Sequence, residues 1–124
     1  LRRALCYPRP PDAFSDERIR YALECAGVAW LAPRLDDAAS WEQVLPLRAQ
    51  QRLGFVRVLL QQPAWIFMEE ATDAFDPKGE RLILEMLHRE LPDAGVLTIS
   101  FHPGLEPLHQ RKIVLTRLRE KKYL

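Results

Sequence analysis

Residues 64–76, which read AWIFMEEATDAFD, constrain the fold more than any other part of the chain. They begin with an uninterrupted apolar run over residues 65–68, which is typical of a strand buried on both faces of a parallel sheet. Glu69 and Glu70 then place two carboxylates at the carboxyl end of this strand, and ligands bind at that edge of open α/β sheets. The segment therefore predicts a buried strand with a ligand site at its end. The simpler alternative is a strand that stops at a solvated acidic turn.

A second strand is expected after one intervening helix. Apolar spacing predicts a helix over residues 78–91, and the run GVLTISF at residues 95–101 predicts another buried strand. A strand, helix, strand sequence makes the two strands parallel, so His102 should lie at the same edge as the two carboxylates. The alternation in residues 111–118 predicts a final strand, and residues 119–122 a solvated tail.

The first half of the chain is predicted to be helical. Ser15 is a good N-cap and Gly27 a good stop for a helix over residues 16–26, and Trp41 is expected to anchor the core. Further helical segments are expected at residues 1–6, at 28–31 before Pro33, and within the strongly apolar stretch 45–63. The expected fold class is α/β, with a helical portion at residues 1–62 and a strand-containing portion at 63–124.

Composition limits the partners more than the fold. The 124 residues are enough for one domain or part of one, and the net charge of +1 gives no field that would attract nucleic acid. Cys6 and Cys25 are too few for a disulfide framework or a zinc site, so they are expected to be structural thiols. No apolar run is long enough to span a bilayer, so this piece is expected to be soluble. Because it begins at Leu1 instead of Met, we expect an excised segment.

Residues 65–76 resemble the Walker B segment and D-loop of ABC transporter ATPases. In that family an apolar strand ends in Asp-Glu, where the Asp holds magnesium and the Glu activates the attacking water. The resemblance implies that Glu69 holds the metal, that Glu70 is catalytic and that Asp76 belongs to the nucleotide site. Glu69 departs from the family pattern because its side chain is one methylene longer.

Two further segments carry the same resemblance. Residues 45–52, LPLRAQQR, are similar to the ABC signature Leu-Ser-x-Gly-Glu-Gln-Gln-Arg, which binds the γ-phosphate of ATP held by the opposite subunit. His102 corresponds to the switch histidine that contacts the γ-phosphate, whereas His88 and His109 are expected to be structural. Residues of the signature that the resemblance assigns to nucleotide binding are Pro46, Leu47, Arg48, Ala49 and Gln50. Pro46, Arg48 and Ala49 replace the Ser, Gly and Glu of the family, so the signature is degenerate.

Nearly the whole chain resembles the ATPase half of fused permease and ATPase transporters. These include bacterial transporters of the vitamin B12, bleomycin and antimicrobial-peptide uptake type, related to the peroxisomal fatty-acid half-transporters. The sequence contains no Gly-x-x-x-x-Gly-Lys-[Ser/Thr] phosphate loop, so the resemblance implies the carboxyl-terminal part of a P-loop NTPase domain. It implies ATP and Mg²⁺ in the complete domain, with weak or absent binding here. The implied partners are the amino-terminal half of the domain, a transmembrane permease and a second ATPase domain, at the cytoplasmic face of a bacterial inner membrane.

Two functions remain open at this stage. The chain is either part of an ATPase that powers transport, inactive by itself, or a degenerate ABC-like domain that acts as a dimerisation or regulatory module without hydrolysis.

Overall fold

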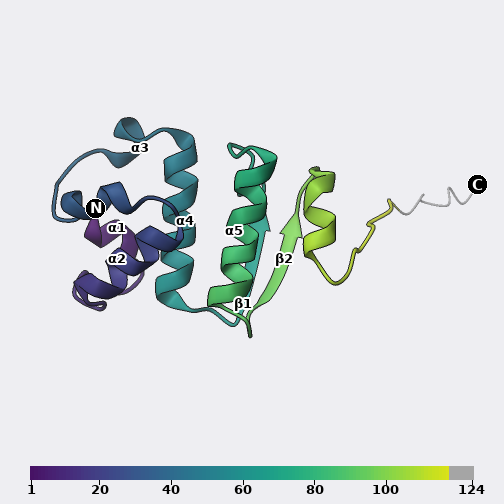
Figure 1. Ribbon diagram of the computed structural model, residues 1–124, viewed down its shortest axis with the longest axis horizontal. Helices are drawn as coiled ribbons and strands as arrows, with labels where there is room; N and C mark the ends of the chain where they lie inside the picture. The colour runs from purple at the N-terminus through teal and green to yellow at the C-terminus, as the bar shows by residue number, and fades with distance from the viewer. Residues whose placement is uncertain (118–124) are drawn as a thin grey trace, which may run out of the picture.

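The computed structural model of the protein describes residues 1–117 and has helices only in its first half, followed by two strands that alternate with helices (Figure 1). The expected tail at residues 119–122 lies outside this range. The elements in chain order are α1 (Arg2–Cys6), α2 (Asp16–Cys25), the 3₁₀ helix η1 (Ala29–Arg34), α3 (Trp41–Val44), α4 (Leu47–Gln61), β1 (Trp65–Glu69), α5 (Pro77–Glu90), β2 (Gly95–Ile99) and the 3₁₀ helix η2 (Pro103–Leu108). The α/β class predicted from the sequence is confirmed.

The predicted boundaries of α2 hold within one residue because the expected caps form. The Ser15 side chain accepts a hydrogen bond from the Arg18 amide at 3.2 Å and starts α2. Gly27 follows the helix with a φ of +73°, the left-handed conformation that glycine adopts without strain. Pro33 lies inside η1 and does not end it, because the segment is a 3₁₀ helix.

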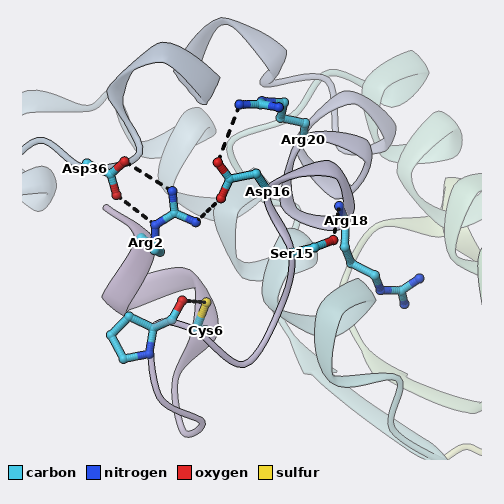
Figure 2. A network of polar contacts seen from close by, with 8 residues as sticks. Arg2, Cys6, Ser15, Asp16, Arg18, Arg20 and Asp36 are labelled. Carbon is cyan, nitrogen blue, oxygen red and sulfur yellow. Dashed lines mark hydrogen bonds and ion pairs between the residues drawn. The ribbon is translucent and has the colours of Figure 1, made fainter.

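Arg2 joins three segments of the helical half (Figure 2). Its guanidinium contacts Asp16 at the start of α2 at 2.6 Å and Asp36 at 2.8 Å. The hydrogen bond from Arg2 also holds the pKa of the Asp36 carboxyl below its usual range. Because both carboxylates are exposed, these ion pairs orient the segments more than they stabilise the fold.

The helix α4 is the central element of the first half. Pro46 occupies its N-cap position, and its buried residues are Ala49, Phe55, Val56, Leu59 and Leu60. They join a hydrophobic core to which α1, α2, β1 and α5 also contribute. Trp41, the expected anchor, is only partly buried, with the Arg34 guanidinium 4.7 Å from its ring centroid.

The two strands confirm the predicted strand, helix, strand unit. They pair in parallel with Trp65 opposite Gly95 and Glu69 opposite Ile99, and α5 lies over one face (Figure 1). Ile66 and Met68 point into the core on that face. Both strands therefore end at the same edge, as expected.

Burial of the sheet differs from the prediction. The face opposite α5 leaves Trp65, Phe67, Leu97 and Ile99 exposed, so neither strand is buried on both faces within the described residues. The reason is that helix α5 covers only one of the two faces of the sheet (Figure 1). The apolar run predicted two covered faces, but no described residue covers the second one.

The predicted final strand is also wrong over the described residues. Residues 111–117 have no regular secondary structure and are exposed, among them Ile113, Val114 and Leu115. Alternation of apolar residues favours a strand only where a neighbouring strand offers an edge to pair with, and these residues pair with neither β1 nor β2.

Candidate functional site

The candidate site lies at the carboxyl edge of the sheet. Figure 1 shows the ends of β1 and β2 at the same end of the molecule as the N-termini of α4 and α5. The loop over residues 70–76 crosses this edge between β1 and α5. The topology therefore gathers the segments that the sequence singled out.

Glu70 has three properties of a functional carboxylate. Its φ is +48°, a left-handed conformation that is strained for a residue other than glycine. Its Oε1 atom is buried and has no hydrogen-bond partner among the described residues. The side chain borders a cavity of about 10 Å³, close to the space of one water molecule, which Thr98 and Ser100 also line. A strained residue with an unpartnered buried oxygen indicates a site more than a solvated turn.

His102 follows β2 and lies near Glu70. Its Nδ1 is 2.9 Å from Oε1 of Glu80, and its backbone amide donates to the Ser100 hydroxyl at 3.0 Å. The hydrogen bond to Glu80 raises the pKa of His102 above 6.5, and the nearby charges of Glu70 and Asp73 raise it further. The charged form of this imidazole is therefore more stable than that of a free histidine, and a positive charge here would attract an anion to this edge.

Glu69 lies apart from Glu70. It shares the exposed face of β1 with Trp65 and Phe67, because successive side chains of a strand point to opposite faces. The described residues contain no group of three or more His, Cys, Asp or Glu side chains that could hold a metal ion. Sites for Mg²⁺ commonly use one or two carboxylates and complete the shell with water and phosphate oxygens. An exposed carboxylate at a strand end fits one position in such a shell.

The signature segment forms the start of α4. Ala49 is buried against the core, and the Gln50 side-chain amide donates to the Leu45 carbonyl at 2.8 Å, so both have structural contacts. Pro46, Leu47 and Arg48 are exposed. The Arg48 guanidinium donates from Nε to the Ala74 carbonyl at 3.2 Å.

A second contact joins the same two segments. The Gln51 side-chain amide donates to an Asp73 carboxylate oxygen and accepts from the Ala74 amide. Asp76, at the end of this loop, caps α5 through a 2.9 Å hydrogen bond from the Gly79 amide. The structure thus links the signature-like segment to the loop that follows Glu70.

Sequence reasoning missed Thr72, Glu80 and Gln51. Glu80 carries a usable signal, because it lies at i, with Ile83, Leu84 and Leu87 at i+3, i+4 and i+7 on the buried stripe of α5. An acidic residue in register with an apolar stripe predicts a buried carboxylate. His109, expected to be structural, contacts Thr98 Oγ1 at 2.8 Å and the Leu105 carbonyl at 2.9 Å.

Fold and site together define an α/β protein with a carboxylate and a histidine at the carboxyl edge of a parallel sheet. No family model matches the chain. It is 33% identical over 115 residues to an uncharacterized ABC transporter ATP-binding protein of Haemophilus influenzae, a match that covers 93% of this chain and 19% of that protein. It is 29% identical over 107 residues to the inner membrane ABC transporter ATP-binding protein YddA of Escherichia coli (85% and 18% covered). It is 34% identical over 121 residues to the mouse lysosomal cobalamin transporter ABCD4 (88% and 19% covered).

The chain is homologous to ABC transporter ATP-binding proteins, which confirms the resemblance seen in the sequence. It spans about a fifth of the length of these relatives. No helix among residues 1–117 is long and apolar enough to cross a membrane.

Proposed function

We propose that this chain is the carboxyl-terminal part of a P-loop ATPase domain, and that the complete protein couples ATP binding and hydrolysis to transport across a membrane. The observation that supports this most is that Glu70 and His102 lie at the same edge of two parallel strands, in a chain homologous to ABC transporter ATP-binding proteins. This arrangement offers a base and a cation to one phosphate group.

Each predicted site residue has a role in this proposal. Glu70 orients and activates the attacking water, and its unpartnered Oε1 supports this because it is free to accept a hydrogen bond. His102 contacts the γ-phosphate, with its positive charge favoured by Glu80. Glu69 would hold Mg²⁺, and the bound ion would neutralise negative charge on the phosphates. Asp76 and the residues Pro46 to Gln50 would border the nucleotide.

The proposed domain division is a helical signature portion at residues 1–62 and part of the ATPase core at residues 63–124. The amino-terminal half of the domain would cover the exposed sheet face formed by Trp65, Phe67, Leu97 and Ile99 and would supply the phosphate-binding loop. Their exposure supports this, because contiguous exposed apolar side chains indicate an interaction surface. By itself the chain should then bind ATP weakly or not at all.

The partners of the complete protein follow from the same proposal. They are a transmembrane permease and a second ATPase domain, which places the parent protein at a membrane. The names of the relatives support this, since they are transporters or ATP-binding proteins of transporters.

A second candidate is a degenerate domain that dimerises or regulates without hydrolysis. It is favoured by Pro46, which has neither a hydroxyl nor an amide hydrogen for phosphate, and by Arg48, whose guanidinium is engaged by Ala74. ATP hydrolysis by the complete protein separates the two candidates.

The test is Mg²⁺-dependent ATP turnover by the complete purified protein and its variants. Glu70→Gln and His102→Ala should each abolish turnover, whereas Glu85→Gln, on the exposed side of α5, should not change it. A complete protein that binds ATP without hydrolysing it, and that is unaffected by Glu70→Gln, would replace the ATPase proposal with the regulatory one.

A further inference from the structure

Thr72, Glu80 and His102 form one continuous polar chain. Thr72 and Glu80 are each 5% exposed and are the buried polar residues of the described core. The Thr72 hydroxyl donates to Oε1 of Glu80 at 2.5 Å, and the same oxygen lies 2.9 Å from Nδ1 of His102. This series of polar contacts connects the loop after Glu70, through Glu80 on α5, to His102 after β2.

A carboxylate buried in an apolar layer is costly unless charged or polar groups satisfy it. Replacement by an apolar side chain of similar volume is often neutral or stabilising when packing is all that matters. Glu80 is also not needed to cap α5, because Asp76 already does so. The position of Glu80 is therefore best explained by the group that it contacts at the surface.

The contact with Glu80 determines which nitrogen of the His102 imidazole carries a proton. A carboxylate can only accept, so Nδ1 of His102 must carry the proton. Nε2 has no hydrogen-bond partner within residues 1–117, and the side chain is 39% exposed. Thr72 donates to the same Oε1 atom, and this second contact restricts rotation of the Glu80 carboxylate. This resembles the way in which a carboxylate sets the tautomer and ring orientation of functional histidines.

We propose that Glu80, held by Thr72, is a positioning residue that fixes the ring orientation and the Nδ1 proton of His102 and leaves Nε2 available to a phosphate oxygen at the sheet edge. The role in phosphate contact rests on the function proposed above, whereas the effect on the ring is a property of this chain alone. The acidic groups that face His102 are Glu80 from α5 and, at greater distance, Glu70 and Asp73 from the loop after β1.

The direct test is the ¹⁵N spectrum of histidine-labelled chain, in which the two ring nitrogens report the tautomer and the protonation state. Glu80→Gln removes the charge, and Glu80→Leu removes both charge and acceptor. We expect both variants to shift the His102 ring signals and to lower the pH at which they titrate, more so for Leu. The matched control Glu85→Gln should leave them unchanged, since Glu85 lies on the exposed side of the same helix and pairs with Arg81.

Variants of Thr72 test the same proposal if a Glu80 variant does not fold. Thr72→Val keeps the shape and removes the hydroxyl, and Thr72→Ser restores it. The His102 signals should move in the Val variant and return in the Ser variant. Unchanged His102 signals in Glu80→Gln, Glu80→Leu and Thr72→Val, with only a loss of stability, would overturn the proposal in favour of a purely structural role.

Kinetics of the complete protein address the consequence for catalysis. Glu80→Leu should lower kcat about 10- to 100-fold with KM for ATP within about twofold, because small misplacement of a catalytic group is costly while nucleotide contacts remain. Failure of the proposed function is distinguishable, since it would leave no turnover in the parent protein while the spectra still report the ring. A fall in kcat without any change in the His102 signals would overturn the positioning role.

Discussion

The Arg48 guanidinium donates from Nε to the Ala74 carbonyl at 3.2 Å and joins the first turn of α4 to the loop that follows β1. Residue 48 takes the place of the glycine in the ABC signature that the segment resembles. Because Arg48 is exposed, the contact is worth about 1 kcal/mol or less and is readily broken. It nevertheless competes with any phosphate for the same guanidinium. The geometry therefore favours Arg48 as a link between two segments over Arg48 as a phosphate ligand.

We expect the double variant Pro46→Ser, Arg48→Gly of the complete protein to raise Mg²⁺-dependent ATP turnover at least about 10-fold. It restores a hydroxyl and frees space for phosphate, and a single such donor is typically worth about 100- to 1000-fold in rate. Ala49 is best left unchanged, because it is buried and a glutamate there would desolvate a carboxylate. Glu85→Gln, on the exposed side of α5, is the control and should have little effect.

The opposite outcome would also be informative. If the double variant lowers turnover, and Arg48→Ala alone lowers it equally, then Arg48 stabilises the transition state in the manner of an arginine finger.

The Asp76 side chain caps α5, and the proposed function gives it a second role at the border of the nucleotide. Asp76→Ala removes the N-cap of α5 and Ser15→Ala removes that of α2, so each should lower the free energy of unfolding by about 1 kcal/mol in urea titrations. If Asp76 also borders the nucleotide, only its variant should reduce ATP turnover of the complete protein by more than the lost stability explains. Equal activity of the two variants would restrict Asp76 to capping.

The sequence allowed prediction of those features that depend on local signals. The boundaries of α2 follow from Ser15 and Gly27, and the shared edge of Glu70 and His102 follows from a strand, helix, strand unit whose strands must be parallel. Both results need only short-range patterns and one topological rule. They account for the fold class and for the centre of the candidate site.

The missed features depend on non-local contacts. The apolar stripe of α5 indicates that Glu80 is buried but not which group it contacts, because His102 lies 22 residues away along the chain. The contact of Arg48 with Ala74 joins residues 26 apart through a long flexible side chain. The apolar run indicates that a sheet face suits burial, but it does not indicate which segment covers that face.

The exposed sheet face predicts self-association of the 124-residue chain. Phe67 is 73% exposed and Ile99 56%, so substitution by lysine should leave folding intact while adding charge to any interface formed there. Phe67→Lys should raise the dissociation constant at least about 10-fold in sedimentation velocity, because full burial of phenylalanine is worth roughly 1.5 to 3 kcal/mol. Leu82→Lys is the matched control, since Leu82 is 55% exposed on α5. A parent chain that stays monomeric at all concentrations would show that the face does not drive association.

The contact between His102 and Glu80 predicts a defined dependence of stability on pH. Because the hydrogen bond to Glu80 raises the folded-state pKa of His102 above 6.5, its contribution to stability is fully present below about pH 6.5. It is lost as the pH rises through the raised pKa, where the imidazole becomes neutral in the folded state as well. We expect the free energies of unfolding of the unmutated chain and of His102→Gln, measured in urea, to differ most below about pH 6.5 and to differ less as the pH rises through the raised pKa. When both proteins also carry Glu80→Gln, the difference between their free energies of unfolding should depend much less on pH. The reason is that the carboxylate charge that favours the imidazolium is gone. A difference between parent and His102→Gln that stays constant across this range, or that grows with pH, would mean that the contact stabilises the fold without linkage to protonation of His102.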